Sequence, residues 1–179
     1  MQYYLVALFD EKSYKKVEYL QKQIADKYNL YEKLPTLHMT LEVIDEAEKD
    51  KLIPLLDKIL KKYSKFTLKI NRGICFDPPY KSVNLKVEKD LDTQSLIYDI
   101  NSSLKANNFK VRENIEDWDL HISLANIYFS KREWETNEFN NACEYIMDME
   151  FDINPTVSEI QLWKPVNNTS EMVLYRKIL

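Results

Sequence analysis

Both histidines of this 179-residue chain begin the same four-residue pattern. The two copies are His38-Met39-Thr40-Leu41 and His121-Ile122-Ser123-Leu124. Alternate residues of a strand point to the same face, so each histidine shares a face with the hydroxyl two residues later. The positions between them are apolar, which is typical of a strand with one packed face. Each copy therefore predicts a strand that presents an imidazole and a hydroxyl side by side.

The residues that flank the two copies continue this alternation. Around the first copy, Glu42 falls on the histidine face and Val43 on the packed face. Around the second copy, Leu120 falls on the packed face and Ala125 on the histidine face. We therefore expect two regular strands in which every second residue, counted from the histidine, lies on the same face as the imidazole.

Hydrophobic periodicity and turn residues predict strands interspersed with helices along the chain. Asp10 is expected to cap the first helix, and Pro54 to bend the second helix or delay its start. A turn is expected at residues 77–80 and a hairpin at the end of the chain. The predicted strands span 2–9, 36–44, 66–76, 82–88, 109–112, 118–127, 157–163 and 172–178, and the predicted helices span 11–28, 46–63, 92–107 and 131–147.

The two copies of the pattern lie about half the chain length apart, and each ends a strand, helix and strand unit. This duplication predicts one α+β domain over residues 1–179 with two pseudo-symmetric lobes. Each lobe is expected to be an antiparallel-rich sheet with its helices outside, and both patterns are expected to line a central cleft. The approximate halves are 1–80 and 81–179, with the alternative that the C-terminal hairpin crosses to the other lobe.

Charge and glycine content narrow the ligands that this chain is expected to bind. The formal net charge of -4 argues against a grip on long duplexes, since that affinity comes from Lys and Arg neutralising phosphates. Gly73 is the only glycine, so no glycine-rich phosphate loop is available for a dinucleotide or a triphosphate. We expect a small nucleotide or an RNA end as ligand and no long duplex; the sequence does not indicate a protein partner.

The cysteines and the apolar stretches indicate the compartment. Cys75 and Cys143 stand in apolar or helical surroundings, and buried reduced thiols are the expectation. A secretory signal is not visible, and no stretch approaches the roughly 20 apolar residues of a membrane span. A cytoplasmic protein without membrane contact is therefore expected, in which the sequons at Asn167 and Asn168 have no role.

Two facing imidazoles supply a base and an acid, because the pKa of histidine lies near neutrality. One deprotonates a nucleophile while the other protonates the leaving oxygen, as in-line attack on a phosphodiester requires. We expect His38 and His121 to be catalytic, and the hydroxyls of Thr40 and Ser123 to bind non-bridging phosphate oxygens. Neither metal nor cofactor is expected, since two histidines without a carboxylate at ligand spacing complete at most half a coordination shell.

The paired patterns resemble those of the two-histidine phosphoesterase superfamily, which includes the bacterial 2′-5′ RNA ligase-like proteins. The resemblance extends over nearly the whole chain: residues 3–10 are similar to the family's opening strand, 82–87 to the strand that begins its second half, and 157–163 to its closing hairpin. It implies a two-lobed fold with both patterns in a central cleft. It also implies metal-independent hydrolysis or transfer at phosphodiesters, often the opening of a 2′,3′-cyclic phosphate to a 2′-phosphate.

The chain departs from the family after the second pattern, where many relatives have a basic residue and this chain has Ala125 and Asn126. The missing phosphate or substrate contact needs a replacement, and for each candidate the alternative is an ordinary surface cation. The candidate cations are Arg112, Lys81 and Arg176. The candidates for stacking on a base at the cleft mouth are Tyr80 and Trp118, for which core or rim packing is the alternative.

Four functions remain open on the sequence alone. The first is a phosphodiesterase that hydrolyses 2′,3′-cyclic phosphates of small nucleotides or RNA ends, with 2′-5′ ligation as the reverse reaction. The second keeps the same site but acts on 2′-5′, 3′-5′ or cyclic oligonucleotides. The third binds a nucleotide or an RNA end without turnover, and the fourth is a structural interaction protein. The matched pair of titrating groups favours the enzymes, because a pure binder needs positive charge more than acid and base groups.

Overall fold

The computed structural model of the chain describes residues 1–166 and 169–179 and confirms the α+β class. Asn167 and Asn168, where the two sequons begin, lie outside these residues. The strands are β1 (Gln2–Phe9), β2 (Met39–Asp45), β3 (Phe66–Thr67), β4 (Ile70–Phe76), β5 (Ser82–Val87), β6 (His121–Ala125), β7 (Thr156–Trp163) and β8 (Val173–Ile178). The helices are α1 (Glu11–Lys27), α2 (Lys49–Leu60), α3 (Leu91–Ala106), the 3-10 turn η1 (Ile115–Asp117), α4 (Thr136–Met147) and the short α5 (Thr169–Met172).

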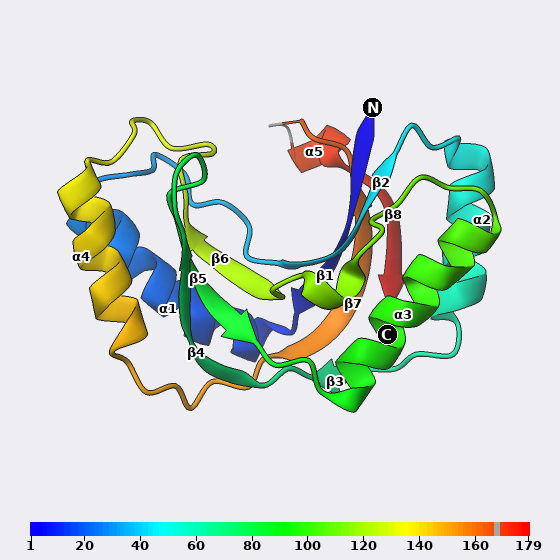
Figure 1. Cartoon of the computed structure of the whole chain (residues 1–179), viewed down its shortest axis with the longest axis horizontal. Coiled ribbons are helices and arrows are strands. Elements are labelled where there is room, and N and C mark those ends of the chain that lie inside the picture. The colour runs from blue at the N-terminus through cyan, green and yellow to red at the C-terminus, as the bar shows by residue number, and fades with distance from the viewer. Residues whose placement is uncertain (167–168) are drawn as a thin grey trace.

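The strands of the described residues form one eight-stranded sheet in the order β3-β7-β1-β2-β6-β5-β4, with β8 also paired to β7. Every pairing in it is antiparallel. Figure 1 shows that this sheet is strongly curved. The two sheets expected from the duplication are therefore joined into one, and the junction is the pairing of β2 with β6.

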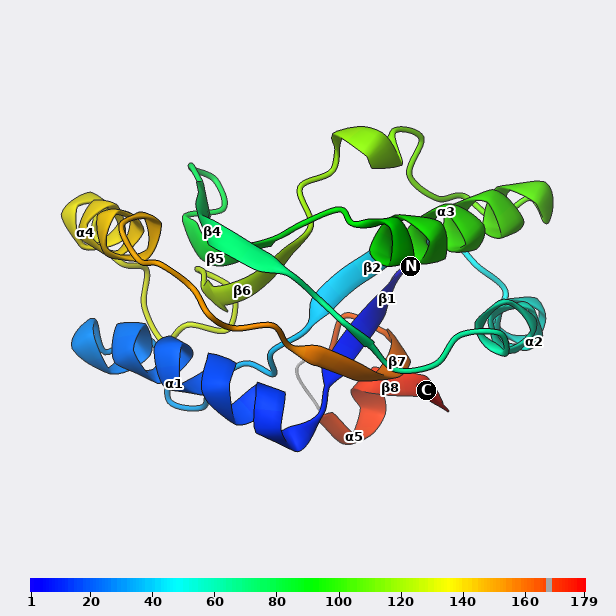
Figure 2. The same ribbon diagram turned by 90° about the horizontal axis from the view of Figure 1, so that it is seen from below.

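The helices lie in two groups at opposite ends of the curved sheet (Figure 1, Figure 2). In one group, α1 packs against β6, and α4 packs against β4 and β5. In the other group, α3 packs against β2 and against α2, which also contacts β8. The closing hairpin of β7 and β8 lies with the second group, because β8 contacts α2. Strand β7 in turn pairs with β1 and β3. Early and late segments are thus interleaved, and a division at residue 80 stays a prediction.

Local signals placed several element boundaries correctly. Asp10 caps α1 as predicted, since its Oδ1 accepts a hydrogen bond from the Ser13 amide at 2.8 Å. Helix α2 begins at Lys49 and contains Pro54. The hairpin predicted at the end of the chain is confirmed by the pairing of β7 with β8. The predicted strand at 109–112 is wrong, because only Lys110 bridges to β2.

Four elements begin several residues later than predicted, namely β2 at Met39 instead of residue 36, α2 at Lys49 instead of residue 46, β6 and α4. The second motif strand begins at His121 rather than at Trp118, because residues 115–117 form η1 before it. Helix α4 begins at Thr136 because a capping box starts it there: the carboxylate of Glu138 accepts from the Glu135 amide at 2.8 Å, and the Glu135 side chain reciprocates.

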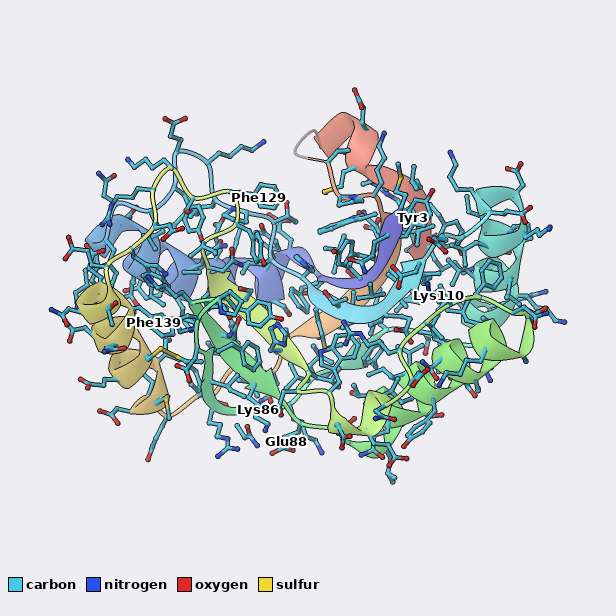
Figure 3. All side chains as sticks on the ribbon, turned by 45° about the horizontal axis from the view of Figure 1, so that its top comes forward. Tyr3, Lys86, Glu88, Lys110, Phe129 and Phe139 are labelled. Atoms are coloured by element: carbon cyan, nitrogen blue, oxygen red, sulfur yellow. A yellow bond between two sulfur atoms is a disulfide. The ribbon has the colours of Figure 1, made fainter. Side chains whose placement is uncertain are left out.

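The expectation of reduced thiols is wrong in this structure. Cys75 on β4 and Cys143 on α4 are both half-buried and form a disulfide, with their Cα atoms 6.0 Å apart. Figure 3 shows the bond in yellow beside Phe139. The cysteines are 68 positions apart in sequence, so only the packing of α4 on β4 brings them together. The same packing explains the single glycine, since a Cβ on Gly73 would collide with Ile146 of α4.

Candidate active site

The two histidine motifs lie on neighbouring antiparallel strands. Met39 of β2 pairs with Ile122 of β6. Because positions step in opposite directions along an antiparallel pair, this register sets His38 beside Ser123 and Thr40 beside His121. The structure therefore brings together the four residues that the sequence singled out. Each imidazole lies next to its own hydroxyl along the strand and next to the other hydroxyl across the strands.

Burial separates the two faces of these strands as predicted. His38, Thr40, His121 and Ser123 are all half-buried. The intervening residues, which include Met39 and Ile122 at 0% exposure, belong to the core. The packed face fixes the backbone, and the opposite face offers two imidazoles and two hydroxyls at partial exposure.

Both imidazoles are held in the same tautomer by the backbone. His38 Nδ1 lies 2.8 Å from the carbonyl oxygen of Thr36, and His121 Nδ1 lies 2.7 Å from that of Asp119. A carbonyl oxygen can only accept, so Nδ1 carries the proton in both rings. In the neutral form, each ring therefore keeps an unprotonated Nε2 that is available to take a proton.

Each imidazole also rests edge-on against an aromatic ring that the sequence analysis did not single out. Trp163 of β7 contacts His38 with ring centroids 4.7 Å apart, and Phe76 of β4 contacts His121 at 4.9 Å. The indole is itself fixed, because its Nε1 donates to Gln161 Oε1 at 2.6 Å. These contacts join distant strands, and their only sequence signal is an aromatic residue at a strand end.

The environment lowers the pKa of both histidines below its ordinary value. Burial is the main cause for His38; the Thr36 carbonyl opposes it, and the charge of His121 adds to it. Burial is again the main cause for His121, opposed by the Asp119 backbone and reinforced by the charge of Arg112. Both imidazoles are thus biased towards the neutral form, which is the form that acts as a base.

Each motif ends at a shift in strand register. Between β1 and β2, Val6 pairs with Thr40 but Leu5 pairs with Glu42, so Leu41 is an extra residue. The pairing of β5 with β6 shows the same event, in which Asn84 pairs with Ser123, Val83 with Ala125, and Leu124 is extra. Such shifts have the character of β-bulges, which re-aim side chains near functional sites. Strict alternation therefore stops at the hydroxyl residue in both motifs.

The register shift overturns the expectation that Glu42 lies on the exposed histidine face. Glu42 is fully buried, while Val43, expected to be packed, is half-buried. The Glu42 carboxylate accepts from Asn101 Nδ2 of α3 at 2.7 Å and from the Val43 amide at 2.9 Å. Ala125 is likewise buried instead of lying on the histidine face.

Arg112 is the candidate cation that lies near the second motif. Its positive charge lowers the pKa of His121, its guanidinium lies over the Trp118 ring, and its Nε is 3.9 Å from Glu42 Oε1. Burial lowers the pKa of Arg112 itself to about 10, so the group remains charged at neutral pH. Trp118 supports this cation by a cation–π contact.

The other candidates from the sequence are engaged away from the histidines. Lys81 Nζ donates to the carbonyl of Trp134 at 3.3 Å, and Arg176 pairs with Glu159 at 2.8 Å. Tyr80 lies in the β4–β5 turn and is 54% exposed, without a contact to either imidazole among the described residues.

Lys86 is a nearby cation that the sequence analysis missed. It pairs in register with His121 on β5, and Figure 3 labels it on that strand. Its ammonium lies 2.8 Å from Asp119 Oδ1, so its charge is compensated by the residue whose carbonyl orients His121. The ion pair between Lys86 and Asp119 thus holds the segment just before the second motif against β5.

Among the described residues, no group of three or more His, Cys, Asp or Glu side chains is arranged to hold a metal ion. None of the helices described in the chain has the length and apolar character needed to cross a membrane.

Comparison with known proteins identifies the family. The family model of the 2′-5′ RNA ligase superfamily matches residues 9–169 of the chain. This chain belongs to the 2′-5′ RNA ligase superfamily. Membership gives the chain a role of phosphoesterase or ligase type. No curated protein sequence matches the chain.

Solved structures share the fold of this chain at low sequence identity. TT0787 of Thermus thermophilus aligns with a TM-score of 0.68 at 14% identity, over 100% of this chain and 98% of that one. E. coli LigT complexed with phosphate aligns with a TM-score of 0.61 at 14% identity, over 99% and 96%. Kluyveromyces marxianus Usb1 aligns with a TM-score of 0.53 at 10% identity, over 99% and 98%. The curved sheet with two motif strands at its centre is therefore built on a fold that these proteins share.

Proposed function

We propose that this protein is a metal-independent phosphodiesterase that hydrolyses the 2′,3′-cyclic phosphate of small nucleotides or RNA ends. The observation that carries the proposal is the equivalence of the two imidazoles. His38 and His121 have the same Nδ1 anchor, the same edge-on aromatic support and a lowered pKa. A pair of this kind supplies one base and one acid without a further group.

In the proposed reaction, Nε2 of one neutral histidine removes a proton from water as the water oxygen attacks phosphorus. The bond from phosphorus to one ring oxygen breaks, and the other histidine, protonated at Nε2, gives its proton to that oxygen. The product is a 2′- or 3′-phosphate, according to which bond breaks. In the ligating direction, the two histidines exchange roles. Thr40 and Ser123 would donate hydrogen bonds to the non-bridging oxygens, where charge accumulates.

We assign Arg112 as the cation that replaces the basic residue expected after the second motif. Its charge acts on His121, and its contact with Glu42 is long, so N–H groups of the guanidinium remain for an anion. Trp118 lies beneath it and would hold the guanidinium in place. Tyr80, Lys81 and Arg176 have no comparable support and are not assigned a role.

Small nucleotides and RNA ends are the proposed ligands. LigT, which shares the fold, is described in complexes with phosphate, 3′-AMP, ATP and NADP+. These complexes support phosphate-bearing small molecules as ligands of the sheet face that carries the two histidine motifs. We place the activity in the cytoplasm, as the sequence analysis expected. The Cys75–Cys143 disulfide argues against this location, because disulfides are rare in a reducing cytosol.

The proposal is tested by turnover of the four nucleoside 2′,3′-cyclic monophosphates in the presence of a chelator, with 2′- and 3′-phosphate products resolved. We expect His38→Ala and His121→Ala each to lower turnover by at least about 100-fold, because each removes a proton-transfer group. Asn141→Ala, an exposed change on α4, is the matched control and should behave as the wild type.

Loss of turnover on chelation would refute the metal-independent mechanism. If the wild type leaves cyclic monophosphates intact but cleaves 2′-5′, 3′-5′ or cyclic oligonucleotides, the substrate assignment is wrong and the paired-histidine chemistry stands. Binding of nucleotides without any turnover would instead identify a binding module.

A further inference from the structure

Asn126 lies three residues after Ser123, and its side chain contacts the Ser123 hydroxyl. Asn126 Nδ2 donates to Ser123 Oγ at 2.9 Å. The orientation of the amide is fixed independently, because the Tyr128 backbone amide donates to Asn126 Oδ1 at 2.8 Å. A backbone N–H can only donate, so the atom facing Tyr128 is the oxygen and the atom facing Ser123 is the NH2 group.

This polarity determines what the Ser123 hydroxyl can do. A serine hydroxyl has one proton to donate and lone pairs to accept. Asn126 occupies an acceptor position of Oγ, and within residues 1–166 and 169–179 no protein group accepts the hydroxyl proton. The proton is therefore directed to a ligand on the motif face. The Thr40 hydroxyl has no comparable partner in that part of the chain, so the two hydroxyls are not equivalent.

The backbone of Asn126 is held by a tyrosine in the loop that precedes the first motif. Tyr31, between α1 and β2, accepts from the Asn126 amide at 2.7 Å and donates to its carbonyl at 2.6 Å. Tyr31 is half-buried, and burial raises the pKa of its phenol, which keeps the proton that it donates. Asn126 is thus fixed at its backbone amide, its backbone carbonyl and its side-chain oxygen, and the remaining NH2 group is aimed at Ser123.

We infer that Asn126 is a positioning residue that orients the Ser123 hydroxyl so that it donates its proton to a substrate phosphate oxygen. The inference rests on the proposed function and extends it to a residue that does not itself touch the reacting atoms. The oriented Ser123 hydroxyl presents a partly positive hydrogen to the phosphate. It therefore does part of what a basic residue after the motif would do, without adding net charge beside His121.

The test is a double-mutant cycle on kcat/KM for a nucleoside 2′,3′-cyclic monophosphate. Asn126→Ala should lower kcat/KM about 2- to 13-fold, the change that corresponds to loss of a hydrogen bond of about 0.5–1.5 kcal/mol. Ser123→Ala removes the donor itself and should cost about 100-fold. In the Ser123→Ala background, Asn126→Ala should change kcat/KM less than about 2-fold, because residues that act through one group are not additive. An equal loss in both backgrounds would overturn the inference.

Asn126→Asp tests the direction of the hydrogen bond and preserves the shape of the side chain. A carboxylate still accepts from Tyr128 but would take the Ser123 proton, so the hydroxyl would turn away from the phosphate. We expect a loss of kcat/KM at least as large as that of Ser123→Ala. Asn141→Asp adds the same charge at an exposed position of α4 and should leave kcat/KM unchanged. Activity of Asn126→Asp close to the wild type would overturn the inference.

Binding of inorganic phosphate separates failure of this inference from failure of the proposed function. The chain has two histidines, so their ring proton signals report phosphate binding by NMR without turnover. If the wild type hydrolyses no cyclic phosphate but Asn126→Ala weakens phosphate binding only when Ser123 is present, the function is wrong and the positioning role stands. If turnover is found and the cycle is additive, the positioning role is wrong. Absence of both turnover and phosphate binding overturns both.

Discussion

Reduction of the Cys75–Cys143 disulfide should lower the stability of this protein substantially. The bond spans 68 positions of the chain and ties β4 to α4. In the chain-entropy description, closing a loop of roughly that length in the unfolded state stabilises the fold by about 4 kcal/mol. At about 2–4 °C per kcal/mol for a chain of this size, the melting temperature should fall by about 8–16 °C on reduction.

The measurement compares thermal unfolding of the oxidised wild type, the reduced wild type, Cys75→Ser and Cys143→Ser. The last three should melt together, because each lacks the same covalent link. Alkylation of the native protein before reduction should label neither thiol. Labelling of both thiols in the native protein, or a melting temperature that changes by less than about 2 °C on reduction, would refute the reasoning and restore the expectation of reduced cysteines.

Two further predictions concern the histidines and the single glycine. Both imidazole signals should titrate below the ordinary value of 6.5, and Arg112→Met should raise the pKa of His121 but not that of His38. An unchanged pKa of His121 in Arg112→Met would contradict the assigned effect of Arg112. Because folding lowers both pKa values, the unfolded chain binds more protons below about pH 6.5, so the two histidines should make stability fall as pH drops through that range. Gly73→Ala should destabilise the fold by about 1–3 kcal/mol in urea unfolding, since its Cβ would meet Ile146; a neutral effect would show that α4 can move away from β4.

Local patterns were sufficient to predict most of the longer helices and strands and to single out the four motif residues, whereas the strand at 109–112 and an undivided strand at 66–76 were wrong predictions. The alternation around His38 and His121 identified both motif strands, and it held as far as Thr40 and Ser123. Asp10 and the spacing of apolar residues located α1. These features depend on residues close together in the chain, so one sequence contains the information that specifies them.

Features that depend on strand partners could not be predicted. The extra residue at Leu41 exists only relative to β1, so Glu42 was placed on the wrong face. The disulfide likewise required a contact between segments far apart in sequence. Asn126 was noted only as the absence of a basic residue, because its value depends on where Tyr128 and Ser123 bring their hydrogen-bonding atoms.

The pairing of Met39 with Ile122 means that the spacing of the two imidazoles is a property of one hydrogen-bonded sheet. Adjacent strands lie about 4.8 Å apart, and this spacing does not depend on domain closure. The proposed acid and base are thus brought together during folding, before any substrate arrives, so the proposed reaction does not require the entropy of bringing them together to be lost again in each cycle. Surrounding loops can then diverge without disturbing the proton-transfer geometry. That separation suits a fold that persists between this chain and TT0787 at 14% identity.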